Sequence, residues 1–320
     1  MEKIKRIDVL LASYNGSKFI EEQIESLIIN FKKITEYNCR ILLSDDGSTD
    51  RTLELIKEME CRYPEFVCFL DGKKKGGVRE NFNFLINSTD ADYVFFCDQD
   101  DFWLPNKMKL FMEEFQKLDT DNEPTLIHSD LCVVDDKLCP INISMFDYQK
   151  INKNPTLKEI IVSNSVTGCV MACNKKLIDL AKKSDLSKSI MHDWYIAILA
   201  FAFGNVRFIN SPLILYRQHG ENGVGAKKMT LSSVLEKNSL SEIIEKSIKS
   251  LTDTKKQAEL IIINYGDMLG NKELSVLNEY VNSFSYSFPH RFWFYLCGGV
   301  RKFGMLRKAG IFLVYILRVK

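Results

Sequence analysis

The front part of the chain alternates between short apolar runs and longer stretches in which apolar residues recur every three or four positions. Such a run predicts a buried strand, because a strand covered on both faces needs no polar side chain. The longer stretches have the spacing of helices with one buried face. The predicted strands are Ile7–Ser13, Cys39–Leu43, Phe66–Leu70 and Tyr93–Cys97, and the helices are Phe19–Phe31, one with Leu53, Ile56 and Met59, and one with Asn81–Ile86. This rhythm predicts an α/β fold with a mostly parallel central sheet flanked by helices.

The rhythm loosens after Asp101. A helix is expected over Pro105–Leu118, since proline is tolerated in the first turn of a helix. The later elements predicted from the pattern are strands at Leu126–Val134, Val166–Ala172 and Val206–Tyr216 and a helix at Asp193–Phe203.

The character of the chain changes near residue 227, where a helical pattern with mixed charges begins and covers Leu231–Leu269. We therefore expect two domains, 1–226 and a helical C-terminal region, 227–320. From Tyr280 to Lys320 there is no Asp or Glu, and Arg and Lys alternate with aromatic residues. Such a segment can lie on an anionic membrane surface. The alternative is a packed helical pair whose basic residues are merely solvated.

Composition adds few restrictions. With 46% hydrophobic and 27% charged residues, the 320-residue chain is expected to fold, and a net charge of +1 gives no general attraction to nucleic acid. Nine cysteines without a Cys-x-x-Cys pair suggest buried, reduced thiols and a cytoplasmic location, which includes the cytoplasmic face of the membrane. The stretch from Met1 to Arg6 leads into a strand and does not look like a signal peptide, and no apolar run approaches the length of a membrane span.

The first candidate motif is Asp98-Gln99-Asp100-Asp101, directly after an apolar strand. Ligands of open α/β sheets bind beyond the carboxyl ends of the strands. Carboxylates crowded there repel one another unless a cation is present, and Mg²⁺ or Mn²⁺ takes carboxylate and phosphate oxygens. If the segment is extended, Asp98 and Asp100 point the same way. The alternative is a solvated acidic turn.

A second motif, Ser44–Asp50, also follows a strand. Gly47 permits a tight turn, and Ser48, Thr49 or Asp50 is suited to capping the next helix. A cap does not account for Asp45 and Asp46, either of which can accept the imide N–H of uracil or thymine.

The third motif is His192-Asp193-Trp194, which opens an apolar helix. Asp193 is either a helix N-cap or a general base that deprotonates an acceptor hydroxyl.

The fourth motif is the polar, glycine-rich segment from Tyr216 to Gly225. Arg217 is suited to gripping a diphosphate and His219 to binding a metal ion or a phosphate. The segment is therefore a candidate lid, and a plain surface loop is the alternative.

In order and spacing, these segments resemble glycosyltransferase family 2 from about Ile7 to Gly225. Ser13, Tyr14 and Asn15 are similar to the turn that follows the family's first strand and binds the nucleotide, and Gly77–Phe82 is similar to an element between the base-binding and metal motifs. The resemblance implies a Rossmann-like GT-A fold with a C-terminal helical extension. It also implies a nucleotide-diphosphate sugar donor and inversion by one displacement.

The resemblance also implies roles for individual residues. Asp45 or Asp46 reads the base, Asp98 and Asp100 hold the metal ion, with Asp98 also at the nucleotide, and Asp193 is the base. His192 stands where the family usually has Glu, and the roles of His192, Trp194 and the extra acid Asp101 stay open. Arg217 and His219 close over the diphosphate, with His219 also a metal ligand.

The segments Phe96–Pro105 and Tyr216–Asn222 look like those of bacterial rhamnosyltransferases, which use dTDP-rhamnose to build cell-wall or surface polysaccharide. The acceptor implied is a glycan or lipid-linked glycan. Two alternatives remain within sugar-nucleotide binding: a transferase that uses a UDP-hexose, and a non-catalytic scaffold of a polysaccharide assembly complex. A nucleotidyltransferase is disfavoured, because the turn after the first strand has a single glycine, Gly16.

Overall fold

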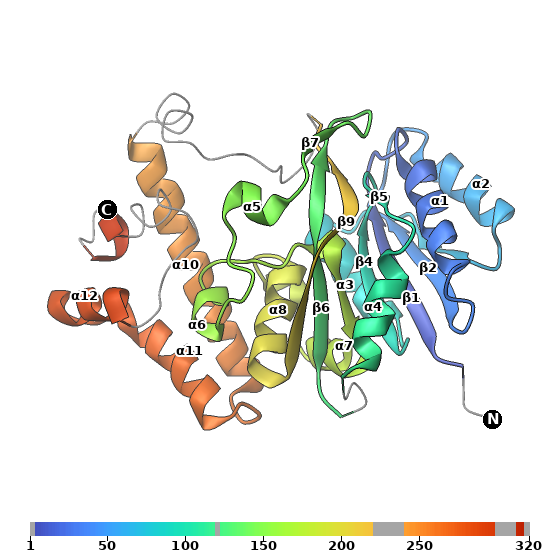
Figure 1. The fold of residues 1–320 in the computed structure, drawn as a ribbon. Helices are drawn as coiled ribbons and strands as arrows, with labels where there is room; N and C mark the ends of the chain where they lie inside the picture. The colour runs from blue at the N-terminus through green and yellow to red at the C-terminus, as the bar shows by residue number, and fades with distance from the viewer. Residues whose placement is uncertain (1–3, 119–121, 220–239, 298–311, 317–320) are drawn as a thin grey trace. The chain divides into compact units, whose positions relative to one another are not determined.

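The computed structural model describes residues 4–118, 122–219, 240–297 and 312–316 (Figure 1). The contacts within the chain divide it into two compact units. The first comprises residues 1–145, 166–200 and 204–225, and the second comprises 146–165, 201–203 and 226–320. The predicted boundary at residue 226 stays a prediction.

The first half of the first unit is a parallel sheet in the order β3-β2-β1-β4. β1, β2 and β4 are buried along most of their length because helices follow them in the chain and supply apolar faces, whereas the edge strand β3 is buried only at Val67. The predicted strands and helices of this part are confirmed. They are β1 (Arg6–Ser13), α1 (Ile20–Phe31), β2 (Asn38–Asp45), α2 (Thr52–Arg62), β3 (Val67–Asp71), α3 (Val78–Ser88) and β4 (Tyr93–Asp98).

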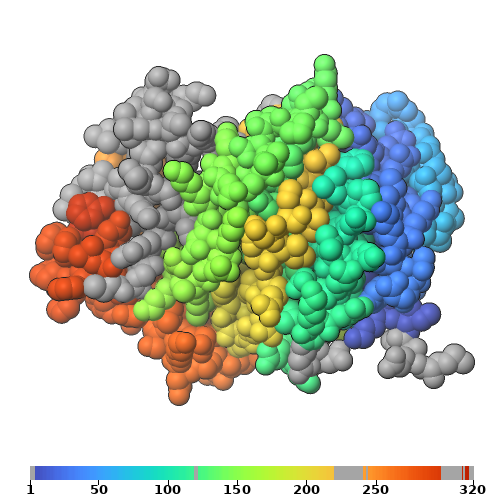
Figure 2. Space-filling view, in the orientation of Figure 1, coloured from blue at the N-terminus to red at the C-terminus, as the bar shows by residue number. Residues whose placement is uncertain are grey.

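The second half of the sheet is mixed. β8 runs antiparallel to β4 and to β6, whereas β6 and β9 are parallel to each other. The predicted strand Val166–Ala172 is wrong at its start: Gly168–Val170 is a 3-10 turn, η1, and the strand begins at Met171. The elements here are β5 (Phe102–Trp103), α4 (Lys107–Gln116), β6 (Thr125–Val134), β7 (Pro140–Asn142), β8 (Met171–Asn174), α7 (Lys175–Ala181), η2 (Leu186–Lys188), α8 (His192–Phe203) and β9 (Asn205–Arg217). β9 reaches the surface in Figure 2, and the first part of this strand is only half-buried.

The second unit is helical. Its core includes the inner faces of α10 and α11, where Thr254 Oγ1 and the Tyr280 hydroxyl are 2.8 Å apart. The predicted helix Leu231–Leu269 is confirmed over Leu240–Tyr265 but ends four residues earlier than predicted, and residues 231–239 lie outside the described part. Within the described ranges, no helix is both long and apolar enough to cross a membrane. The elements are α5 (Met145–Gln149), which begins at the unit boundary, α6 (Leu157–Ile160), α10 (Leu240–Tyr265), α11 (Asn271–Ser283), α12 (Phe288–Cys297) and the π-helical turn η3 (Phe312–Ile316).

The cysteines agree only partly with expectation. The eight cysteines whose side chains the structure describes are free thiols, but Cys61 and Cys139 are exposed. Cys61 lies near the end of α2, away from its buried residues, and Cys139 directly precedes β7. Cys61 lies between Glu60 and Arg62, and the apolar neighbours of Cys139 did not ensure its burial.

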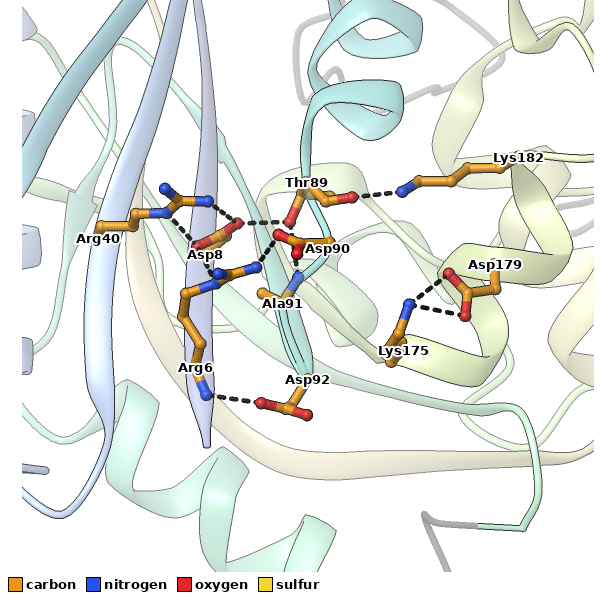
Figure 3. A network of polar contacts seen from close by, with 10 residues as sticks. All are labelled: Arg6, Asp8, Arg40, Thr89, Asp90, Ala91, Asp92, Lys175, Asp179 and Lys182. Carbon is orange, nitrogen blue, oxygen red and sulfur yellow. Dashed lines mark hydrogen bonds and ion pairs between the residues drawn. The ribbon is translucent and has the colours of Figure 1, made fainter. Parts of the chain in front are cut away.

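A polar network ties the amino-terminal ends of the strands together (Figure 3). Asp8 of β1 is fully buried and accepts hydrogen bonds from Arg40 Nε at 2.7 Å and Arg40 Nη2 at 3.1 Å. The Thr89 hydroxyl donates to the same carboxylate at 2.5 Å, and Lys182 donates to the Thr89 carbonyl oxygen. The network joins β1, β2 and the segment before β4. It lies at the opposite end of these strands from the turns that follow them.

Candidate active site

The parallel register brings three strand ends to one edge of the sheet. Ser13, the last residue of β1, pairs with Asp45, and Ala12 pairs with Asp98. The turns that follow β1, β2 and β4 therefore meet there. In open α/β sheets this is the edge at which ligands bind, and all predicted site residues lie in the first unit.

Asp45 fastens the turn after β2 to the end of β1. Its buried carboxylate accepts the Ser13 hydroxyl at 2.8 Å, the Ser48 hydroxyl at 2.5 Å and the Ser48 N–H at 2.7 Å. The N–H of Asn15 in turn donates to Ser48 Oγ at 2.8 Å. Both carboxylate oxygens of Asp45 therefore accept hydrogen bonds from within the fold.

Asp46 has one oxygen left. Its Oδ1 accepts the backbone N–H groups of Lys75 and Gly76, the latter at 2.9 Å. Its Oδ2 makes no hydrogen bond to any residue that the structure describes. Asp46 therefore has an acceptor that its own fold does not use. Tyr14, predicted to lie beside the nucleoside, is 54% exposed.

Gln99 was not singled out from the sequence, yet it joins two turns of the site. It accepts the Tyr14 N–H at 2.8 Å and donates to the Tyr14 carbonyl at 2.9 Å. A Cβ atom on Gly16 would lie 2.1 Å from Gln99 Oε1, so glycine permits this approach. The expectation of an extended acidic segment is wrong: Asp98 ends β4, and Gln99 and Asp100 form a turn.

The end of β9 folds over this acidic turn. His219 Nε2 lies 2.9 Å from Asp100 Oδ2, so two residues predicted to bind metal are in contact. Residues 220–225 of the predicted lid lie outside the described part.

Arg217 is buried, and its hydrogen bonds support the acidic turn. Its N–H donates to Asp101 Oδ1 at 3.2 Å and its Nε to the Asp100 carbonyl at 2.9 Å. Its Nη1 donates to the Asp136 carbonyl at 2.7 Å, and its Nη2 pairs with Glu22. These contacts make Arg217 a support for the metal motif, and a direct grip on a diphosphate stays a prediction.

The acidic residues crowd one another. Burial, then the carboxylates of Asp100 and Asp193, raises the pKa of Asp98 to about 7. Burial, then Asp100 and Asp98, raises the pKa of Asp101 well above its usual range. Ligand atoms of Asp98, Asp101 and Cys169 lie within 4.8 Å of one another. Crowded carboxylates favour a bound cation, and oxygen ligands with one imidazole fit Mg²⁺ or Mn²⁺.

Two buried residues beside this cluster were missed by sequence reasoning. Burial raises the pKa of the Cys169 thiol well above 9, which keeps it protonated and a poor ligand for a hard cation. Lys107 Nζ donates to the Cys169 carbonyl at 2.8 Å and lies 3.2 Å from the centre of the Trp103 ring. Burial lowers the pKa of Lys107 to about 7. Lys107 lies inside the predicted helix, and nothing in the local pattern distinguished it from a surface lysine.

Asp193 lies in the first turn of α8 and is only 8% exposed. The N-cap is Met191, so the alternative that Asp193 is the N-cap is wrong. Its Oδ2 accepts the Gly168 N–H at 3.1 Å and its Oδ1 the Trp194 N–H at 2.6 Å. Asp193 is close enough to Asp98 to raise the pKa of that carboxyl group, which brings the predicted base beside the predicted metal ligands.

His192 packs as an aromatic ring against two phenylalanine side chains. Its ring stacks on Phe82, with 3.9 Å between ring centres, and lies 5.5 Å from Phe96. Burial lowers the pKa of His192 to about 3, so the imidazole is neutral near pH 7. Neither ring nitrogen hydrogen-bonds to a residue in the described ranges.

Comparison with known proteins finds related sequences. A family model described as glycosyl transferase family 2 matches residues 8–165. The chain is 30% identical over 234 residues to the dTDP-rhamnosyl transferase RfbG of Shigella flexneri, covering 68% of this chain and 74% of that protein. It is 24% identical over 225 residues to an uncharacterized glycosyltransferase of Nostoc sp., covering 68% of this chain and 66% of the other.

Solved structures share the fold. TarS of S. aureus, residues 1–349, superposes with a TM-score of 0.54 at 15% identity, covering 91% of this chain and 75% of that one. The same protein in complex with UDP-GlcNAc gives a TM-score of 0.53 at 17% identity, covering 91% of this chain and 76% of that one. The likeness confirms the expected GT-A fold, with its central sheet, flanking helices and C-terminal helices.

Proposed function

This chain belongs to glycosyl transferase family 2, and we propose that it moves rhamnose from dTDP-rhamnose to a hydroxyl group of a growing cell-surface or cell-wall glycan. The observation that carries the proposal is the meeting of Asp46, the Asp98–Asp100–His219 group and Asp193 at one edge of the sheet. A transferase needs a base reader, a diphosphate site and a proton acceptor side by side. The donor is chosen because a 30% identical relative is named a dTDP-rhamnosyl transferase.

Asp46 is the better candidate for reading the base. Asp45 uses both carboxylate oxygens within the scaffold, whereas Asp46 keeps Oδ2 available to accept the imide N–H of thymine. Ser13, Tyr14 and Asn15 line the nucleoside side of the same turn. Gln99 holds this turn against the acidic one and thereby fixes the distance between base and diphosphate.

Asp98, Asp100 and His219 would hold Mg²⁺ or Mn²⁺. Such an ion supplies positive charge that neutralises the departing nucleotide diphosphate. Arg217 keeps the backbone of the acidic turn in place, while Asp101 accepts the Arg217 N–H. The ligand group is therefore supported from both the β4 and the β9 side.

Asp193 takes the proton from the acceptor hydroxyl as that oxygen attacks the anomeric carbon. The bond from carbon to the nucleotide breaks in the same displacement, which inverts the configuration. The Gly168 N–H holds Asp193 Oδ2, and the preceding residue, His192, is neutral near pH 7 and packs on Phe82. The acceptor is a glycan or lipid-linked glycan at the cytoplasmic face of the membrane, with residues 280–320 as the predicted peripheral contact.

One competing donor class has specific support. TarS, which shares the fold, forms complexes with UDP and UDP-GlcNAc, so a UDP-hexose is the alternative donor. A scaffold that binds a sugar nucleotide without turnover is the alternative from another functional class, and the retained acidic residues disfavour it.

Calorimetry with dTDP-rhamnose, UDP-glucose, UDP-galactose and GDP-mannose, each with and without Mn²⁺, tests the proposal. We expect Mn²⁺-dependent binding of dTDP-rhamnose that Asp100→Ala removes. Tighter binding of a UDP-sugar than of dTDP-rhamnose would make the UDP-sugar the proposed donor. No binding to a folded protein would overturn the transferase assignment, and binding without slow donor hydrolysis would support the scaffold.

A further inference from the structure

Helix α12 has one face that is firmly packed. Arg291 and Phe294 are only 5% and 8% exposed. Arg291 donates to the carbonyl oxygens of Tyr286 at 2.5 Å and Ile316 at 3.0 Å, and the edge of one ring faces the other where Phe294 meets Tyr286. These contacts fix the rotation of the helix about its axis within the second unit.

The other face carries large apolar side chains in water. They recur four, one and three positions apart, which places them on neighbouring parts of one helical surface. The Phe288 and Phe292 rings are stacked with an angle of 20° between their planes. We call this surface the α12 stripe: Phe288, Phe292, Trp293 and Leu296 are 52%, 37%, 65% and 42% exposed, respectively. A contiguous exposed apolar surface marks an interaction site.

The charge of the sequence indicates which partner fits. The chain from Tyr280 to Lys320 contains seven Lys and Arg residues and no acid. Arg291 packs inward, and the other six lie outside the described residues. Trp and Phe within a cationic, acid-free sequence suit the boundary between head groups and acyl chains of an anionic bilayer. A ten-residue helix is about 15 Å long, too short to span a bilayer, so it would lie in the membrane plane.

We propose that the α12 stripe inserts into the interfacial layer of an anionic membrane and anchors the protein there peripherally. The stripe gives the apolar contact, and the net positive charge of the acid-free sequence that contains it gives attraction to anionic lipid. This inference names the contact surface for the membrane association proposed above. It does not depend on the sugar donor, so its failure leaves the transferase assignment intact.

The experiment is co-sedimentation of the full chain with phosphatidylcholine vesicles, with and without phosphatidylglycerol. We expect wild-type protein to bind the anionic vesicles and Phe292→Gln/Trp293→Gln to bind them at least about tenfold more weakly. Ile263→Gln is the matched control, because Ile263 is an exposed apolar residue on α10, outside the stripe, and should bind as wild type. Equal circular dichroism melting curves verify that all three proteins are folded.

Tryptophan emission reports insertion directly. Trp103 is fully buried and Trp293 is the most exposed member of the stripe, so we expect a blue shift with anionic vesicles that disappears in Trp293→Phe although that variant still binds. Unchanged binding by the double variant, or no wild-type binding, would overturn the proposal. A wild-type dimer in ultracentrifugation that the double variant loses, without vesicle binding, would instead assign the stripe to a second copy of the chain.

Discussion

His219 Nε2 lies 2.9 Å from Asp100 Oδ2, although 119 positions separate the two residues in the chain. The contact joins the end of β9 to the turn after β4. An imidazole nitrogen and a carboxylate oxygen this close together are placed to bind the same divalent cation.

Replacing His219 tests this arrangement. We expect His219→Gln to weaken Mn²⁺ binding at least about 100-fold, because loss of a direct ligand should exceed the usual cost of losing an outer contact. His290→Gln is the matched control, since His290 is exposed on α12. Mn²⁺ affinity is measured by electron paramagnetic resonance. Equal affinities of the two variants would remove His219 from the ligand set.

Asp193→Asn tests the base. Asparagine keeps the size of the side chain and an oxygen for the Gly168 N–H but cannot accept the acceptor's proton. We expect kcat to fall by about 10²–10⁴ with unchanged calorimetric affinity for the donor. Asp179→Asn, which alters only an exposed pair with Lys175, is the control. Turnover near that of wild type would reject Asp193 as the base.

The raised pKa of Asp98 determines how we expect the free energy of unfolding to depend on pH when no metal ion is bound. Burial and the carboxylates of Asp100 and Asp193 raise the pKa of Asp98 from 3.8 to about 7. Between these values the folded protein keeps a proton that the unfolded chain has lost, so the free energy of unfolding falls as pH rises from about 4 to about 7. Thermal melts in EDTA should show this fall in wild type and a shallower one in Asp98→Asn. Parallel curves would contradict it, whereas saturating Mn²⁺ should raise wild-type stability most at the upper end of the window.

Two substitutions of His192 distinguish a role in packing from a role in catalysis. Because the ring is buried with unsatisfied nitrogens, His192→Phe should preserve the stacking on Phe82 and raise the free energy of unfolding by about 1 kcal/mol. His192→Ala should lower it by about 3 kcal/mol by leaving a cavity. We expect His192→Phe to keep kcat within about threefold and the shape of its pH profile, since burial lowers the His192 pKa to about 3. A large kcat loss in a folded His192→Phe would show that an imidazole nitrogen is used.

The Asp8 network should matter for stability and not for the site. Asp8→Ala leaves Arg40 without its buried partner and should lower the free energy of unfolding by about 3 kcal/mol. Asp179→Ala, which breaks the exposed pair also drawn in Figure 3, should cost less than about 1 kcal/mol. Urea unfolding measures both. An equal loss of unfolding free energy in the two variants would mean that the buried Asp8–Arg40 pair stabilises the fold no more than the exposed pair does.

Much of the first half of the fold could be predicted from the sequence. The strands that end at Ser13, Asp45 and Asp98 are short apolar runs bounded by polar turns, and burial and periodicity are properties of neighbouring residues. The order of the motifs likewise indicated the residue types of the site. The predicted start of β8 was wrong because the apolar stretch before Met171 forms a 3-10 turn, which periodicity does not distinguish from a strand.

The sequence by itself therefore determined the elements, the family resemblance and the candidate acids. Only the tertiary structure decided how these acids are held. Gln99 bridges to Tyr14, Lys107 reaches the Cys169 carbonyl and Arg217 supports the acidic turn across distances of 62 to 117 positions. Such contacts depend on which strands become neighbours in the sheet, and pairing between distant segments leaves no periodic signal in the local sequence.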